Sequence, residues 1–278
     1  MDVAGKVAVI TGGATGIGKA LAQGLVARGA SVVIASTSRE RLDAAAAEIG
    51  GAVRAVVCDV TDRAAVRRLA EEAEAAFGPV DIVCANAGAT TFGPFVDVAE
   101  SDWDWMIDLV LKGVAHCIQE FYPKMVARGS GHIMLTGSQT AYAPDWVLGH
   151  GPYVAAKGAV HALAFQLRPE AAEHGVEVSL LVPAATHTDV QQGSRSRPAR
   201  YGTSERGKMW MREGGAAPDP AWPMYLSAEE VAARAIAGIE ANAALIATHA
   251  GMKPVVEDYF ARILAAYDAA AAFGGEQG

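Results

Sequence analysis

Apolar residues recur along this chain in two ways, as short unbroken runs and as longer segments with a helical period. The runs are rich in Val, Ile, Leu and Ala without polar alternation, which is typical of strands covered on both faces. The expected strands are Val7–Thr11, Ser31–Ala35, Val53–Cys58, Ile82–Ala85, His132–Leu135 and Val176–Val182 and, after them, Ala243–Thr248. The expected helices are 16–28, 39–48, 62–77, 101–127, 152–173 and 227–241.

Because strands and helices alternate, the pattern predicts an α/β fold with a single Rossmann-like, doubly wound parallel sheet and helices on both faces. Residues 189–226 break this rhythm, since they are rich in Gly, Pro, Ser and Arg and have no strong period. So long a loop is uncommon within a compact domain, and its place after the sixth strand predicts a lid at the carboxyl edge of the sheet. We expect one domain over 1–278, with a disordered tail over 274–278.

Charge and cysteine content argue against several kinds of partner and site. The formal net charge of −8 disfavours nucleic acid and anionic membranes as partners. The cysteines, Cys58, Cys84 and Cys117, are too few and too scattered for a disulfide framework or a zinc site, and no other cluster has metal-ligand spacing. The chain shows no signal-peptide pattern and no run near the ~18 apolar residues of a membrane span. These features predict a soluble cytoplasmic protein without a bound metal.

A glycine-rich turn joins the first strand to the first helix, from Thr11 to Gly18. Glycines here allow a tight turn and a close approach of the backbone to a pyrophosphate, and the helix N-terminus supplies free N–H groups. Between a strand and a helix at the start of a doubly wound chain, the turn predicts a dinucleotide site. The expected contacts from this turn are Gly12, Thr15, Gly16, Ile17 and Gly18.

The Gly-x-x-x-Gly-x-Gly spacing resembles the short-chain dehydrogenase/reductase family, and further matches follow in order over roughly residues 5–250. They are an aspartate after the third strand, an Asn-Ala-Gly segment after the fourth, a serine after the fifth, a Tyr-x-x-x-Lys pair, and a Pro-x-x-x-x-Thr turn in which Ala184 replaces the family's glycine. The resemblance implies a dinucleotide-binding catalytic domain and a nicotinamide cofactor. The implied cofactor contacts are Asp59, Val60, Asn86, Ala87, Gly88, Tyr153, Lys157, Pro183 and Thr188.

The end of the second strand distinguishes NAD from NADP. An acidic residue there would bind the ribose hydroxyls and repel a 2′-phosphate, but this chain has three hydroxyl residues, Ser36 to Ser38, followed by Arg39. We expect NADP(H) to be preferred, held by Ser36, Thr37 and Arg39. In the alternative, Arg39 only begins a solvated helix, and NAD(H) can serve.

Tyr153 and Lys157 are four residues apart, so on a helix they share a face. A free tyrosine has a pKa near ~10, and a nearby ammonium would favour its phenolate. Tyr153 is then the expected general acid/base for interconverting a secondary alcohol and a ketone, and Ser138 the group that holds the substrate oxygen. The resemblance also assigns Lys157 to the nicotinamide ribose.

The family often carries a fourth catalytic residue, an asparagine in a segment resembling Asp-x-Asn-x-x-Gly. Alignment of residues 103–113 puts Val110 at that position, and valine cannot hydrogen-bond to the water that the asparagine helps to hold. Either the proton relay is built otherwise, or activity is reduced, or the chain no longer catalyses. A non-catalytic NADP-binding sensor or scaffold is therefore one alternative function.

The segment 194–204 resembles the lid of a subgroup that includes the Cα-dehydrogenases of lignin β-aryl ethers, which oxidise benzylic secondary alcohols. Four aromatic residues near this lid are placed to wall an aromatic or bulky apolar substrate, or else pack at a subunit contact or under the lid. They are Trp146, Trp210, Trp222 and Tyr225. The expected substrate-binding residues are Ser138, Trp146, His150 and Tyr153.

Two expectations concern partners. A reductase of carrier-bound 3-oxoacyl chains is a second alternative, although an acidic chain suits an acidic carrier poorly. The helices 101–127 and 152–173 have broad apolar faces, and in the family the equivalent helices pack two-fold, which implies a homodimer or homotetramer.

Overall fold

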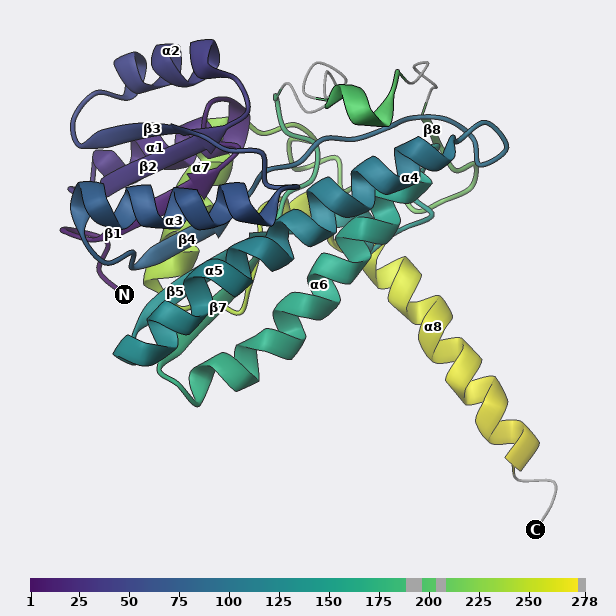
Figure 1. Cartoon of the computed structure of the whole chain (residues 1–278). Helices are drawn as coiled ribbons and strands as arrows, with labels where there is room; N and C mark the ends of the chain where they lie inside the picture. Colours follow the sequence, from purple (N-terminus) through teal and green to yellow (C-terminus); the bar gives the residue numbers. More distant parts are fainter. Residues whose placement is uncertain (189–196, 204–208, 275–278) are drawn as a thin grey trace.

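The computed structural model describes residues 1–188, 197–203 and 209–274 (Figure 1). Seven parallel strands form one sheet in the order β3-β2-β1-β4-β5-β7-β9, which confirms the predicted doubly wound α/β fold. The strands are β1 Val7–Thr11, β2 Ser31–Ser36, β3 Val53–Val57, β4 Ile82–Ala85, β5 Gly131–Thr136, β7 Val176–Val182 and β9 Leu245–Ala247. The strand order reverses between β1 and β4, and parallel sheets of this kind form a crevice at the carboxyl ends of such strands.

Helices cover both faces of the sheet (Figure 1). Residues that alternate along β1 divide between two cores, because successive side chains of a strand point to opposite faces. Ala8 and Ile10 pack with α1, α2 and α7, whereas Val7 and Val9 pack with α3, α5 and α6. These helices are α1 Gly16–Val26, α2 Arg39–Ile49, α3 Arg63–Phe77, α5 Gly113–Arg128, α6 Gly151–Ala172 and α7 Ala228–Glu240.

The helix expected over 101–127 is interrupted. It consists of α4 Glu100–Met106, a π-helical segment η1 Ile107–Lys112, and α5. A Cβ at Gly113 would lie 2.7 Å from Cγ2 of Val60, so the chain after the π-helical segment passes close to the end of β3. Such widened turns are frequent at functional sites. The interruption faces the carboxyl edge of the sheet.

Two features lie outside the expected elements. Helix α8, Lys253–Gly274, follows β9 and projects away from the body (Figure 1). A short antiparallel pair joins β6 Val147–Leu148 to β8 Trp210–Met211.

Part of the expected lid, 189–196 and 204–208, and the tail residues 275–278 lie outside the described residues. No helix in the part of the chain that the structure describes is long and apolar enough to cross a membrane.

Candidate active site

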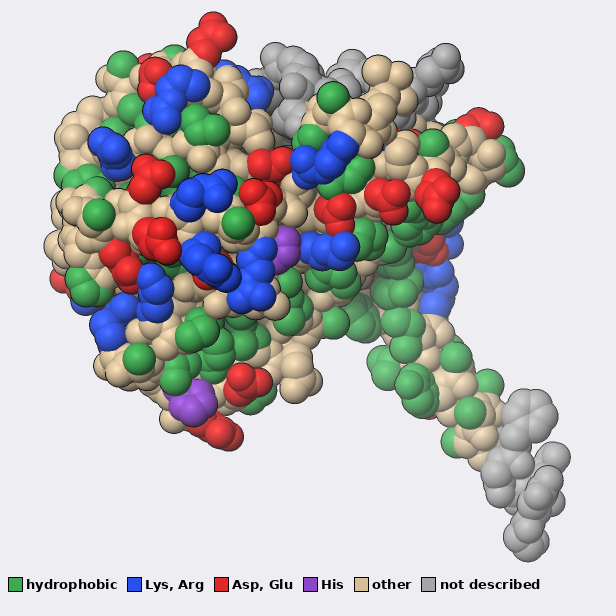
Figure 2. Space-filling model, viewed as in Figure 1, with side chains coloured by type: hydrophobic (Ala, Val, Ile, Leu, Met, Phe, Trp, Pro, Cys, Tyr) green, Lys and Arg blue, Asp and Glu red, His purple; other side chains and the backbone are tan. Residues whose placement is uncertain are grey.

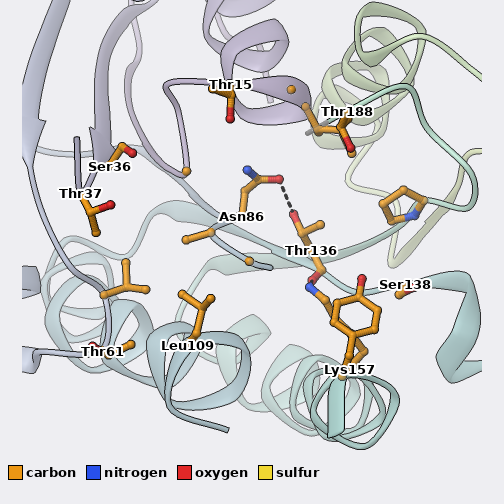
Figure 3. A pocket seen from close by; sticks show the side chains of 18 of the residues that line it. Thr15, Ser36, Thr37, Thr61, Asn86, Leu109, Thr136, Ser138, Lys157 and Thr188 are labelled. Carbon is orange, nitrogen blue, oxygen red and sulfur yellow. Dashed lines mark hydrogen bonds between the residues drawn. The ribbon is translucent and has the colours of Figure 1, made fainter. Parts of the chain in front are cut away.

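A long cavity follows the carboxyl ends of the central strands. Figure 3 shows its two ends, with Ser36 and Thr37 on one side and Ser138 and Lys157 on the other. Most of the expected cofactor contacts line it, drawn from the ends of five strands and from helix α6. They are Gly12, Thr15, Gly16, Ile17, Ser36, Thr37, Asp59, Val60, Asn86, Ala87, Gly88, Tyr153, Lys157, Pro183 and Thr188. The geometry therefore unites residues that are far apart in sequence.

The glycine turn has a geometry that other residues could not adopt without strain. Gly12 and Gly16 have φ of +67° and +51°, and a Cβ at Gly18 would lie 2.2 Å from the carbonyl oxygen of Gly12. Gly18 therefore supports the turn from behind and is not among the cavity-lining residues. The N-cap Thr15 makes no side-chain capping bond within the described residues, so the first amides of α1 stay available at the cavity. This cradle fits the diphosphate of a dinucleotide.

Hydrogen bonds tie the ends of β1, β4 and β5 together. The Thr11 hydroxyl accepts hydrogen bonds from the backbone amides of Asn86 and Ala87, each at 3.0 Å. The side-chain nitrogen Nδ2 of Asn86 donates to the Thr11 carbonyl at 3.1 Å. Asn86 Oδ1 in turn accepts from the Thr136 hydroxyl at 3.3 Å (Figure 3). Thr11 and Thr136 were not among the expected site residues, and each is a hydroxyl residue at the end of a buried strand.

Three polar groups meet at the other end of the cavity. The buried Lys157 donates from Nζ to the Thr136 carbonyl at 2.6 Å, and Nζ lies 5.7 Å from the centroid of the Tyr153 ring. Ser138, which follows β5, accepts at Oγ from the Thr140 hydroxyl at 2.9 Å and hydrogen-bonds to Tyr153. Phenol, ammonium and hydroxyl thus lie together at one end of the cavity.

Burial controls the protonation of this pocket. It raises the pKa of Tyr153 above its usual value, and a hydrogen bond from Ser138 opposes the rise only in part. Burial also lowers the pKa of Lys157 to about 8. The sequence led us to expect that the Lys157 ammonium would lower the pKa of Tyr153. In the protein without a cofactor, desolvation has the larger effect on both pKa values. Burial costs the Tyr153 phenolate and the Lys157 ammonium more hydration free energy than their neighbours' interactions restore.

The arginine at the end of β2 differs from the expected one. Arg41 lines the cavity beside Ser36 and Thr37, whereas Arg39 is absent from the lining that the described residues form. Arg39 instead pairs with Asp43 at 3.4 Å on the outer surface of α2. The physical reason is that Ser38 caps α2 by accepting from the Arg41 amide, so residues 39 and 41 project from different sides of its first turn.

The segment 197–201 borders the cavity, which Pro198 lines. Arg197 is buried and binds Asp102 of α4, donates to the Tyr201 carbonyl at 2.7 Å and packs 5.1 Å from the Trp105 ring. Pro198, which follows it, lines the cavity. This part of the expected lid is therefore held against α4.

Tyr201 and Arg200 extend this contact. The Tyr201 hydroxyl donates to Asp108 of η1 at 2.7 Å, while Arg200 bonds to Thr61 and pairs with Asp59 at 3.3 Å. Residues 199–201 are thereby tied to the turn that follows β3 as well as to the π-helical segment.

Two expected substrate-binding residues, Trp146 and His150, are not among the described residues that line the cavity. Trp146 is 7% exposed and packs with Met252 and Val255 in a small separate core. The His150 ring lies 5.7 Å from the Tyr153 ring, and its Nε2 has no hydrogen-bond partner among the described residues. His150 is thus close to the pocket, whereas Trp146 supports it from behind.

The π-helical segment separates two side chains that a sequence alignment sets next to each other. Leu109 lines the cavity, and Val110 is fully buried in the core. Val110, which the sequence comparison with the family set at the asparagine position, is therefore part of the core packing. Other cavity-lining residues that the sequence argument did not single out are Cys58, Thr61, Trp105, Gly137, Ala184 and Thr186.

Comparisons with known proteins agree with this arrangement. A family model described as short chain dehydrogenase matches residues 6–199. A C alpha-dehydrogenase of Sphingobium sp. strain SYK-6 is 34% identical over 268 residues, which cover 95% of this chain and 87% of the relative.

Solved structures of relatives hold either nicotinamide dinucleotide. A short chain dehydrogenase/reductase from Burkholderia phymatum in complex with NAD is 28% identical, with a TM-score of 0.82, covering 92% of this chain and 93% of that one. A short-chain dehydrogenase from Sphingobium yanoikuyae in complex with NADPH is 26% identical, with a TM-score of 0.72 and coverage of 96% and 95%.

Proposed function

Because this chain belongs to the short-chain dehydrogenase/reductase family, we propose that it is an NADP(H)-dependent oxidoreductase interconverting a secondary alcohol and a ketone. The observation that carries the proposal is the meeting of Ser138, Tyr153 and Lys157 at one end of a cavity whose other end carries Ser36 and Thr37. A cofactor spanning the cavity would bring its reactive ring to the three polar groups.

A nicotinamide held in this cavity would supply the carbon that accepts or donates hydride. In oxidation, Tyr153 would act as the deprotonated phenolate, take the proton of the alcohol and then pass that proton to solvent. In reduction the same oxygen returns a proton to the nascent alkoxide. Ser138 donates a hydrogen bond to the substrate oxygen, which matters most when that oxygen is charged. The raised pKa of Tyr153 suits the acid role, since the phenol keeps its proton at neutral pH.

Replacement of Tyr153 by Phe tests this mechanism. Removing the hydroxyl deletes the acid/base, so kcat for 1-arylethanols with NADP⁺ and for aryl ketones with NADPH should fall about 10²- to 10⁴-fold. The Kd for NADPH, followed by fluorescence, should change little because the ring remains. A variant that keeps most of its activity contradicts the proposal. Wild-type protein that binds NADPH but oxidises it with no carbonyl favours the sensor instead.

A bulky apolar or aromatic substrate is part of the proposal. It is supported by the similarity to a C alpha-dehydrogenase and by exposed aromatic side chains after β7, namely Trp210, Trp222 and Tyr225. The carrier-bound alternative lacks comparable support, because Arg212 and Arg262 are each paired with Asp145 and Asp258. Positive and negative side chains also intermix over α3 and α5 (Figure 2).

We also propose that the protein is a homodimer or homotetramer. Helix α8 projects from the body and carries hydrophobic side chains on its surface (Figures 1 and 2). Phe260, Ile263, Leu264 and Tyr267 are 36–73% exposed. Apolar surface of this kind is typical of contact sites. Light scattering tests the proposal, and a mass equal to one chain contradicts it.

A further inference from the structure

Helix α6 carries a third polar residue in register with the proposed catalytic pair. Tyr153, Lys157 and His161 are spaced by four, so they lie along one face of the helix. The side chain of His161 is buried, with 6% of the residue exposed, and the mechanism above gives it no part. A buried imidazole one turn beyond Lys157 therefore needs a physical explanation.

His161 makes a hydrogen bond to the backbone of Ser138. The Ser138 amide donates to Nε2 at 3.1 Å, although the two residues are 23 positions apart. Acceptance at Nε2 requires a ring whose proton is on Nδ1. Burial, followed by the charge of Lys157, lowers the pKa of His161 to about 4, so the ring is neutral at pH 7.

The turn after β5 is shaped to admit this ring. A Cβ at Gly137 would lie 2.3 Å from Nε2 of His161, so only glycine permits the approach. The amides on either side of Ser138 bond in another direction, Gly137 to the Leu181 carbonyl at 2.7 Å and Gln139 to the Pro183 carbonyl at 2.8 Å. The amides of Gly137 and Gln139 thus bond to the end of β7 and to the residue after it, whereas the Ser138 amide between them bonds to α6.

We propose that His161 is a positioning residue that holds Ser138 in place relative to Tyr153 and Lys157. All three polar groups then take their positions from one helix, two directly and Ser138 through the imidazole. The serine hydroxyl itself bonds only to Thr140, two residues further along the same turn, and to Tyr153 among the described residues, so the imidazole is the contact that ties the Ser138 backbone to α6. This role rests on the proposed function, since it concerns the geometry of the reacting groups.

Activity and binding measurements on the full chain give the first test. His161→Leu removes the acceptor and should lower kcat about 10-fold or more, while the Kd for NADPH stays within about 2-fold. His161→Gln retains a side-chain oxygen acceptor and should recover much of the loss. The matched control is His132→Leu, because His132 is equally buried but bonds Ser179 at the opposite end of β5. Equal losses of kcat in the two leucine variants would overturn the proposal.

A double-mutant cycle separates positioning from general damage. If His161 acts through Ser138, then adding His161→Leu to Ser138→Ala should lower kcat little further, because the serine hydroxyl is already absent. Losses that simply multiply would overturn the proposal. Gly137→Ala gives an independent variant in case His161→Leu fails to fold. Its methyl group should push the imidazole away from the Ser138 amide and lower kcat in the same manner.

Hydrogen exchange at the Ser138 amide tests the contact without any turnover. This amide should exchange about 10-fold faster or more in His161→Leu and in Gly137→Ala, and at the wild-type rate in His132→Leu. Unchanged exchange in the first two variants would overturn the proposal. If wild-type protein oxidises no alcohol, the proposed function fails while the exchange result still decides whether His161 holds the turn.

Discussion

On the proposed function, single side chains at the end of β2 would decide between NAD(H) and NADP(H). Ser36 and Thr37 line it together with Arg41, and no carboxylate is among the lining side chains on α2 that the structure describes. Hydroxyl groups and a cation suit a 2′-phosphate, which carries charge and strong acceptors. Arg39 lies two residues earlier on α2 and pairs with Asp43 on the surface of that helix. Two arginines of the same helical turn thus have different surroundings.

Arg41→Ala should weaken NADPH binding about 10- to 100-fold and leave NADH binding nearly unchanged, because hydrogen bonds to charged groups contribute about 1.5–3 kcal/mol. Arg39→Ala is the matched control and should affect neither dinucleotide. Fluorescence titration of both variants with both cofactors measures the effect. Equal weakening of NADPH and NADH by Arg41→Ala would contradict a phosphate contact.

At the scale of elements, the segment 197–201 depends on α4 and η1 for its position. Arg197 and Asp102 have side chains that are 4% and 7% exposed, and Ser101 accepts from the same guanidinium at 2.9 Å. Ionic groups so deeply buried are costly unless paired, so removing one partner has a large effect. Pro198 carries that effect to the cavity, because it lines the cavity next to the buried arginine.

Arg197→Met should lower the free energy of unfolding by about 3–5 kcal/mol, since it removes a buried ion pair together with the hydrogen bonds to Ser101 and to the Tyr201 carbonyl. It should also weaken NADPH binding by loosening Pro198. Arg68→Met, which breaks an exposed pair with Asp62 at 3.7 Å, is the control and should cost at most about 1 kcal/mol. Urea unfolding compares the two. Equal midpoints for both variants would count against the buried contact.

Across the whole molecule, buried histidines link stability to pH. Burial lowers the pKa of His132 and of His161 to about 4, from a usual value of 6.5. Between these values the unfolded chain binds protons that the folded chain does not. Stability is therefore fully present above pH 6.5 and is lost as the pH falls toward 4, by about 1.4 kcal/mol per pH unit for each group.

His132→Leu should make the free energy of unfolding less steeply dependent on pH between pH 6 and pH 5, by about 1.4 kcal/mol per unit. Ser179 keeps its bond to the Ala243 carbonyl at 2.6 Å, so the substitution strands no hydroxyl. Chemical unfolding at several pH values measures the slope. An equally steep slope in His132→Leu would contradict the linkage.

The sequence by itself determined the sheet, the glycine turn and the order of the site residues. Continuous apolar runs indicate strands buried on both faces, and the turn after Thr11 is a local pattern of glycines, so neither needs knowledge of distant contacts. The spacing of Tyr153 and Lys157 likewise follows from helical geometry. The turns of the parallel strands converge at one edge, so residues placed at those ends meet there.

Only the tertiary structure decided which neighbours the site residues have. Arg41 rather than Arg39 lines the cavity because of the way Ser38 caps α2, and desolvation of the Tyr153 phenol raises its pKa in spite of the nearby Lys157. The bond from Ser138 to His161 spans 23 residues, and the Arg197–Asp102 pair spans 95. Such contacts depend on how helices pack against the sheet, whereas periodicity reports only which face of each element is apolar.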